Sequence, residues 1–278
     1  KEYINFKLGG RAKYFFVAKT KEEIIEAVKL AKQENISFYI LGGGANLLVA
    51  DEGYDGLIIK IQNSKSKILN SKIHSDAGGL LKDIVELAVR NSLSGLEWAA
   101  GVPGEVGGGV YGNAQAFGEN MAGVVEEVEG FNCSNFEVKK FDREECGYSE
   151  KTSVFKKNKN LIILSTVLDL KKGDAKEIKE KIKEHFNLRK EKHPLDYPSA
   201  GSMFVNNPSN PPSSYLIEKA GLKGLRVGDA QVSEKHAGFI INLGKATCKD
   251  VLELVAQIQL KVKEKFQIEL EQEVQIIK

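Results

Sequence analysis

The chain has 278 residues, of which 42% are hydrophobic and 28% charged, as in an ordinary globular protein. Its 40 lysines and arginines nearly balance 38 aspartates and glutamates, which argues against a dedicated nucleic-acid binder or a polybasic membrane binder. No apolar run approaches the roughly 18 residues of a membrane span, and Cys133, Cys146 and Cys248 form no metal or disulfide pattern. We expect a cytoplasmic protein without a metal site, a nucleic-acid partner or membrane insertion. Because the sequence starts at Lys1, we also expect a few leading residues to be missing, and no segment predicts a signal peptide.

Hydrophobic spacing predicts alternating helices and strands, with Thr20 and Glu23 as a capping box at the first helix. The predicted elements, in chain order, are extended chain at 3–17, a helix at 20–35, strands at 37–41, 46–50 and 56–61, a helix at 80–91, strands at 124–132, 137–142 and 161–170, helices at 174–190 and 213–220, a strand at 238–242, a helix at 249–266 and a strand at 269–277. This mixture predicts an α+β protein of two parts, 1–172 and 173–278.

Two glycine-rich segments lie in the first part. The triplet Gly42–Gly44 follows a predicted strand, but LLVADEGYDG after it predicts a strand and a turn, whereas a dinucleotide fingerprint requires a helix there. We interpret the triplet as a strand–loop–strand crossing whose N–H groups can approach phosphate oxygens, with a plain glycine-rich hairpin as the alternative. The second segment, 95–118, is so rich in glycine that a purely structural loop is an unusual explanation. Two such loops indicate an extended ligand with a pyrophosphate, and a dinucleotide fits.

These segments, LGGGANLLVADEGYDG and GLEWAAGVPGEVGGGVYGNAQAFG, resemble the flavin-binding loops of the UDP-N-acetylenolpyruvoylglucosamine reductase family. The similarity continues, in the family's order, at FKLGGRA (6–12), YPSAGSMFVNN (197–207), GLKGLRVGDAQVSEKHAGFIIN (221–242) and LEQEV (270–274). The resemblance implies a vanillyl-alcohol-oxidase (PCMH)-type FAD-binding domain at 1–172 and a C-terminal α+β substrate-binding domain at 173–278. The last strand, about 268–278, is the one element that could return to the first domain. The short length resembles the family type that lacks an extra substrate-covering insertion.

The resemblance also implies an activity. NADPH reduces non-covalently bound FAD, which then passes hydride to the enolpyruvyl ether of UDP-N-acetylglucosamine enolpyruvate. A protein acid protonates the adjacent carbon, and the product is UDP-N-acetylmuramate for peptidoglycan synthesis. We expect the chain to act as a monomer.

Individual site residues follow from the same resemblance. Ser202 matches the family's proton-donating serine, and Glu273 matches its catalytic glutamate. Lys192 matches a lysine that meets the substrate pyrophosphate, Asn206 an asparagine on the nucleotide sugar, and Arg226 is a weaker substrate candidate. The residues expected to hold FAD are Leu41, Gly42, Gly43, Gly44, Ala45, Asn46, Leu47, Gly101, Val102, Pro103, Gly104, Val106, Gly107, Gly108, Asn113 and Ala114.

The sequence departs from the family at several of these places. Lys151 stands where a catalytic arginine is expected, which keeps the charge but loses the planar fork that binds a carboxylate through two bonds. Glu150 beside it replaces a tyrosine, Glu105 a threonine, Gln115 a glycine and Val205 a lysine.

Other interpretations remain open at this point. One is an FAD-dependent oxidase of the same fold, which would consume oxygen without NADPH. Another is a degenerate relative that binds FAD or a nucleotide sugar without turnover, which Lys151 and Glu150 suggest. His236 is expected to make structural hydrogen bonds rather than a covalent flavin link.

Overall fold

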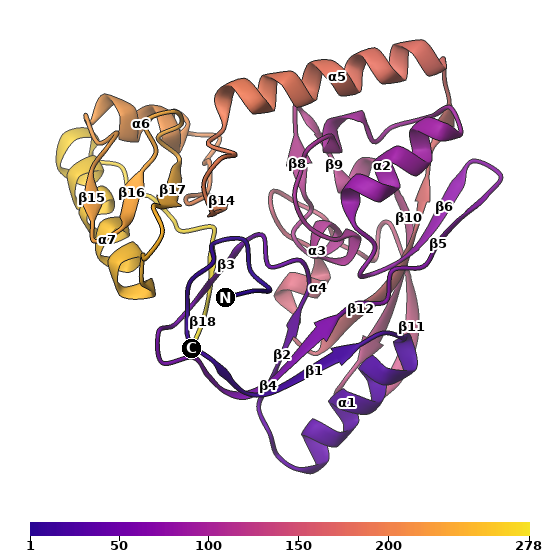
Figure 1. Cartoon of the computed structure of the whole chain (residues 1–278). Coiled ribbons are helices and arrows are strands. Elements are labelled where there is room, and N and C mark those ends of the chain that lie inside the picture. Colours follow the sequence, from indigo (N-terminus) through magenta and orange to yellow (C-terminus); the bar gives the residue numbers. More distant parts are fainter. The chain divides into compact units, whose positions relative to one another are not determined.

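The structure, a computed structural model, describes all 278 residues and divides into two compact units. Unit 1 comprises Lys1–Lys13, Gly44–Asp55 and Lys190–Lys278, and unit 2 comprises Tyr14–Gly43 and Gly56–Arg189. Helices and strands are mixed along the chain (Figure 1), which confirms the α+β class. The units differ in their bounds from the two predicted parts: 1–13 and 44–55 belong to the unit that contains the C-terminal residues, and 173–189 belong to the other. The predicted domain division stays a prediction.

A five-stranded antiparallel sheet lies at the centre of unit 2. Its order is β11-β10-β12-β6-β5, formed by Ser66–Leu69 (β5), Lys72–Asp76 (β6), Val125–Asn132 (β10), Glu137–Asp142 (β11) and Leu161–Asp169 (β12). The last three strands match the predicted ones within a residue. The β5–β6 hairpin was not predicted, because the turn contains neither glycine nor proline; Asn70 supplies the left-handed φ of 59° instead. Trp98, Phe131 and Phe155 are fully buried in the core of this unit.

The remaining elements of this part of the chain are mostly short. The helices are Lys21–Gln33 (α1), Leu81–Arg90 (α2), Val106–Tyr111 (α3), Val154–Lys157 (α4) and Ala175–Lys192 (α5), with 3-10 turns at Glu97–Ala99 and Met121–Gly123. Thr20 caps α1 by accepting a 3.1 Å hydrogen bond from the Glu23 N–H, as predicted. The Glu23 carboxylate, however, accepts from the Lys19 N–H rather than that of Thr20, so the capping box is only half formed.

A second sheet has the order β1-β4-β2, formed by Ala12–Ala18 (β1), Phe38–Leu41 (β2) and Tyr54–Ile61 (β4). Strands β2 and β4 are parallel. Two small antiparallel pairs complete the set, β7 (Leu93–Ser94) with β13 (Lys171–Lys172) and β8 (Gln115–Ala116) with β9 (Glu119–Asn120). Of the extended segment predicted at 3–17, only the part from Ala12 forms a strand; before it the chain turns, and Lys7 has a φ of 58°.

In unit 1, helix α7 packs against a four-stranded sheet of order β14-β17-β16-β15, and helix α6 packs against α7 (Figure 1). The elements are Leu47–Val49 (β3), Ser199–Ser202 (β14), Ser213–Lys219 (α6), Arg226–Val227 (β15), Ala230–Val232 (β16), Phe239–Asn242 (β17), Cys248–Phe266 (α7) and Gln275–Ile277 (β18). The predicted strand at 269–277 is shorter in the structure, because Gln272 forms an isolated bridge with Phe204 instead of continuing β18. No helix of the structure combines the length and apolar character needed to cross a bilayer.

Candidate active site

The glycine triplet connects two strands, as predicted: β2 ends at Leu41 and β3 begins at Leu47. At Gly43, a Cβ atom would lie only 2.9 Å from the Gly104 Cα, so glycine is required where the two glycine-rich segments approach each other. Gly44 has a φ of +64°, which also favours glycine. Glycine at positions 43 and 44 is thus required by close packing of the protein's own backbone.

The second glycine-rich segment contains a helix that was not predicted. Local propensity argues against α3, whose sequence is VGGGVY, but packing overrides it. Cβ atoms at Gly107 and Gly109 would lie 2.8 Å from the Ala77 Cβ and 2.7 Å from the Met121 Cε, so these two glycines face the core. Gly108 is exposed and has nothing within 4 Å of its Cβ position. One side of this short helix therefore presents open, side-chain-free backbone, which fits the FAD expected here.

A buried ion pair lies beneath the triplet. Lys60 Nζ and Glu105 Oε1 are 2.6 Å apart, and the two residues are only 8% and 6% exposed. Glu105 Oε2 is buried without a hydrogen-bond partner and lies 3.3 Å from the Cβ position of Gly42. Burial raises the pKa of the Glu105 carboxyl above its ordinary value, and the ammonium of Lys60 only partly offsets this. Lys60 was missed from the sequence, because nothing in β4 indicates a charged partner 45 residues away.

Lys151 lies at the tip of a tight turn in unit 2. The backbones of Ser149 and Thr152 exchange hydrogen bonds of 3.2 and 3.3 Å, with Glu150 and Lys151 between them. Asn113 Nδ2 donates a 3.0 Å bond to the Ser149 carbonyl oxygen, and its Oδ1 accepts one from the Ala122 N–H. Both amide atoms of Asn113, a residue predicted to bind FAD, are therefore bonded to protein backbone. Lys151 itself is partly exposed.

The backbone segments that carry Ser202 and Glu273 lie side by side in unit 1, although 71 residues separate the two residues. Ser202 ends β14, where it pairs with Phe239, and the Glu273 N–H donates a 2.9 Å bond to the carbonyl oxygen of the next residue, Met203. Asn46 of the first glycine-rich segment joins them: its Nδ2 donates to the Glu273 carbonyl oxygen at 3.3 Å, and its own carbonyl accepts from the Gln275 N–H at 3.1 Å. The structure thus brings three predicted site residues together: Asn46, Ser202 and Glu273.

The three predicted substrate residues are placed differently. Lys192 is exposed at the C-terminal end of α5. Asn206 Oδ1 accepts bonds from the Ser213 N–H and hydroxyl, both at 2.9 Å, so only its Nδ2 could donate to a ligand. Arg226 is paired with Asp229 and bonded to the Gly228 carbonyl oxygen within the β15–β16 hairpin, which gives its guanidinium a structural task.

An aromatic cluster adjoins the strand position of Ser202. The rings of His193, His236 and Phe239 have centroids 5.0 to 5.3 Å apart. His236 Nδ1 accepts a 3.2 Å bond from the Gly238 N–H, which agrees with the structural role predicted for it. Burial lowers the pKa of His236 below its ordinary value, so the imidazole is neutral at pH 7. His193 was missed, because the sequence places it in a charged helix end with no spacing signal.

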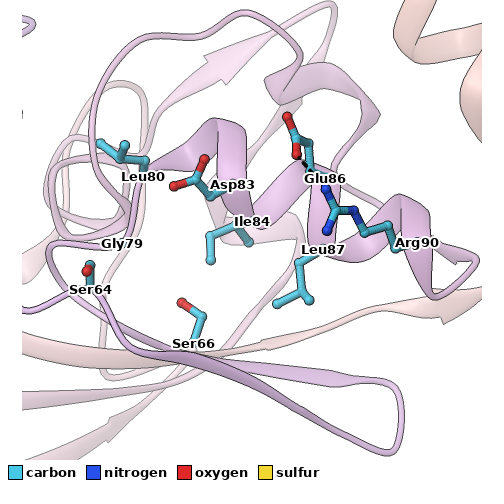
Figure 2. Close-up of a pocket in the computed structure, with 9 residues that line it drawn as sticks. All are labelled: Ser64, Ser66, Gly79, Leu80, Asp83, Ile84, Glu86, Leu87 and Arg90. Atoms are coloured by element: carbon cyan, nitrogen blue, oxygen red, sulfur yellow. Dashed lines mark hydrogen bonds and ion pairs between the residues drawn. The ribbon is translucent and has the colours of Figure 1, made fainter.

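A hollow elsewhere in unit 2 is not this site. A hollow of about 330 Å³ lies between α2 and the β5–β6 hairpin, and Figure 2 shows the ion pair of Glu86 and Arg90 beside it, with Ser64 and Ser66 on the facing side. None of the predicted cofactor, catalytic or substrate residues lines it.

Comparison with known proteins identifies the family of the chain. Residues 12–131 match the family described as FAD binding domain, and residues 193–277 match the C-terminal domain of UDP-N-acetylenolpyruvoylglucosamine reductase. The curated reductase of that name from Caldanaerobacter subterraneus subsp. tengcongensis is 43% identical over 281 residues, which cover 100% of this chain and 91% of the relative. The one from Clostridium kluyveri is 42% identical over 278 residues, covering 100% and 90%.

A solved structure gives the same result in three dimensions. The crystal structure of UDP-N-acetylenolpyruvylglucosamine reductase from Thermus caldophilus matches with a TM-score of 0.85 and 35% identity, covering 100% of this chain and 96% of that one. The predicted combination of an FAD-binding domain with the reductase's C-terminal domain is confirmed. The chain belongs to the UDP-N-acetylenolpyruvoylglucosamine reductase family.

Proposed function

We propose that this FAD-dependent oxidoreductase reduces the enolpyruvyl group of UDP-N-acetylglucosamine enolpyruvate with NADPH, and that Ser202, Glu273 and Lys151 act on the substrate. One observation supports the residue assignment most directly: the Glu273 N–H is bonded to the carbonyl oxygen that follows Ser202, while Asn46 of the glycine-rich segment is bonded to the Glu273 carbonyl. The backbone of Glu273 is therefore connected both to the residue after Ser202 and to the Asn46 side chain of the expected cofactor loop.

The glycine-rich backbones hold the cofactor in this proposal. Gly42, Gly43, Gly104 and Gly108 offer backbone N–H groups without side chains, and the Cβ position of Gly108 is open, which suits a pyrophosphate and a flat ring. When bound, FAD supplies the two-electron relay from NADPH to the enolpyruvyl double bond. Asn113 contributes by fixing the backbone of this loop, since its side-chain amide is already bonded to Ser149 and Ala122.

The protein's own residues supply the proton and the charge. Ser202 Oγ donates the proton to the carbon next to the one that receives hydride, and Glu273 is the neighbouring carboxyl that supports this transfer. The ammonium of Lys151 lies against the substrate carboxylate and stabilises the negative charge that grows on it. Lys192 and the Nδ2 of Asn206 hold the pyrophosphate and the nucleotide sugar. Arg226 is the weakest of these candidates, because its guanidinium is engaged by Asp229.

The proposed setting is the cytoplasm, and the proposed state is a monomer. All three cysteines are free thiols, as is typical of a reducing compartment. The product, UDP-N-acetylmuramate, would serve peptidoglycan precursor synthesis.

Product analysis tests this function against its alternatives. The purified protein, loaded with FAD, is incubated with NADPH and UDP-N-acetylglucosamine enolpyruvate, and NADPH loss, oxygen uptake and the mass of the nucleotide sugar are followed together. We expect one NADPH consumed for each substrate that gains two hydrogen atoms, without matching oxygen uptake. Oxygen uptake in the absence of NADPH would indicate an oxidase, and a bound flavin with no product would indicate a non-catalytic relative.

A further inference from the structure

The turn that carries Lys151 has an unfavourable backbone conformation. Lys151 has a φ of +51°, in the left-handed region that residues with long side chains rarely adopt. Glycine or asparagine would be the usual choice at this position of a tight turn. Such a conformation persists only where the surrounding structure restrains it, and it is often found at functional sites. The question is therefore which contacts hold this turn.

The first restraint is buried. Asn113 is only 3% exposed, and its two amide atoms connect two separate segments: Nδ2 bonds the Ser149 carbonyl oxygen and Oδ1 bonds the Ala122 N–H, both at 3.0 Å. Asn113 itself has a φ of +45°, which asparagine tolerates better than most residues. Because a buried amide that loses one partner is costly, this contact fixes the start of the turn.

The second restraint joins two of the positions at which this sequence departs from the family pattern. Gln115 Nε2 donates a hydrogen bond to Glu150 Oε1, directly beside Lys151. A glycine at position 115 could make no such bond, and a tyrosine at position 150 would offer no carboxylate. Lys156 Nζ adds a 2.8 Å bond to the Lys151 carbonyl oxygen, and Ser153 Oγ bonds the Tyr111 carbonyl at 2.8 Å. The two departures therefore contact each other.

We propose that Asn113 and Gln115 are positioning residues that hold the Ser149–Thr152 turn so that Lys151 reaches the substrate carboxylate. This inference rests on the catalytic role proposed for Lys151. It assigns to Asn113 a different task from cofactor binding through its side chain. It also explains how a lysine can replace an arginine here. A lysine side chain is flexible and lacks the rigid fork of arginine, so its ammonium depends more on a fixed backbone position to reach the carboxylate.

The test separates the two half-reactions in stopped-flow experiments. The variants are Gln115→Ala, Asn113→Asp and Lys151→Ala, and the measured rates are flavin reduction by NADPH and flavin reoxidation by UDP-N-acetylglucosamine enolpyruvate. We expect Gln115→Ala to slow reoxidation about 10-fold and Asn113→Asp up to about 100-fold, as small displacements of a catalytic group do. For Gln115→Ala, flavin reduction and the FAD dissociation constant, measured by flavin fluorescence, should change less than about 2- to 3-fold, as for a surface substitution away from the cofactor.

Asn63→Asp is the matched control for the buried change. Asn63 is 2% exposed in the same unit and has the same pattern of bonds, from Nδ2 to the Leu164 carbonyl and from the Gly78 N–H to Oδ1. The Asn63→Asp variant should lower the unfolding temperature as Asn113→Asp does. Its ratio of reoxidation rate to reduction rate should stay unchanged. Equal ratios in the two Asp variants would overturn the proposal.

A double-mutant cycle decides whether the effect passes through Lys151. In a Lys151→Ala background, Gln115→Ala should slow reoxidation no further, because residues that act as one unit are not additive. Exchanging the pair as Gln115→Glu with Glu150→Gln should recover most of the rate that Gln115→Glu alone loses. Additive effects, or no recovery, would overturn the proposal. If Lys151→Ala alone leaves reoxidation unchanged while product still forms, the inference falls but the proposed reaction stands.

Discussion

The Glu273 N–H donates a 2.9 Å hydrogen bond to the carbonyl oxygen of Met203, which directly follows Ser202. This one bond fixes the backbone of Glu273, among the last ten residues, next to the residue that follows Ser202 at the end of β14. The isolated bridge between Phe204 and Gln272 reinforces it on the other side. Ser202 and Glu273 are thus held by backbone contacts that do not depend on either side chain, so that both can be substituted without removing the contacts that place them.

Ser202→Ala should therefore affect chemistry rather than folding. Because the hydroxyl is assigned only to the protonation step, flavin reduction by NADPH should remain nearly normal, and reoxidation by the enolpyruvyl substrate should slow by about 10²–10⁴-fold. Stopped-flow absorbance of the flavin measures both rates. Ser199→Ala, on the same strand, is the control and should change neither. Equal slowing of both half-reactions would mean that the substitution had disturbed the flavin site instead.

Lys151→Ala should lower kcat more than it raises KM, because the lost charge acts mainly as the transition state forms. The expected loss is on the order of 10²-fold, typical for one charge-stabilising group. Lys151→Arg should keep activity, since it restores the fork that grips a carboxylate. Lys157→Ala, an exposed lysine on α4, serves as the control in the same steady-state assay. An unchanged kcat in Lys151→Ala would remove this residue from the chemistry.

Gly108→Ala separates folding from cofactor binding. The Cβ position at Gly108 is open, so the apoprotein should tolerate alanine and gain roughly 0.4–1 kcal/mol of stability from the reduced freedom of the unfolded chain. If the cofactor approaches this bare backbone, the new methyl group should raise the FAD dissociation constant by about 10-fold or more, since overpacking typically costs about 1–3 kcal/mol and about 1.4 kcal/mol is tenfold in affinity. Flavin fluorescence and thermal unfolding measure the two effects.

Gly112→Ala provides the comparison for that prediction. Its Cβ would lie 3.6 Å from the Gly108 carbonyl oxygen, an ordinary contact, and it belongs to the end of the same helix. It should leave FAD affinity unchanged. The account of α3 as a cofactor surface would be wrong if both variants bound FAD as tightly as the unmodified protein.

His236 should make stability depend on pH below neutrality. Burial lowers its pKa in the folded state, so the unfolded chain binds more protons below about pH 6.5. The stability contributed by the neutral imidazole is therefore present above pH 6.5 and is lost as the pH falls through the folded-state value. His236→Asn, which can still accept from the Gly238 N–H, should lose less stability between pH 7 and pH 5.5. Urea unfolding of the unmodified protein and the variant across this range measures the difference. Equal losses of stability in the two proteins would contradict the role assigned to His236.

Much of the fold could be predicted from the sequence, and the failures have local causes. Strands β10 to β12 and helices α2, α6 and α7 were found because their apolar residues recur with a clear period. Helix α3 was missed because three consecutive glycines oppose a helix, and only the packing of Gly107 and Gly109 against Ala77 and Met121 stabilises it. The hairpin β5–β6 was missed because its turn carries no glycine.

The sequence indicated a set of site residues, which stay predictions, but it did not indicate the contacts among them. The motif around Ser202 and the one around Glu273 each pointed to a catalytic residue, yet nothing in either indicates the Met203 bond that joins them. The pairing of Gln115 with Glu150 was equally hidden, because two exchanges that look unfavourable separately become a contact only in the folded chain.

Anaerobic spectroscopy of the purified protein tests the central claim most directly. The FAD-loaded protein should be yellow, NADPH should bleach the flavin absorbance, and UDP-N-acetylglucosamine enolpyruvate added afterwards should restore it without oxygen. The same recovery should be strongly slowed in Ser202→Ala. A protein that takes up no FAD, or a bleached flavin that only oxygen restores, would contradict the account.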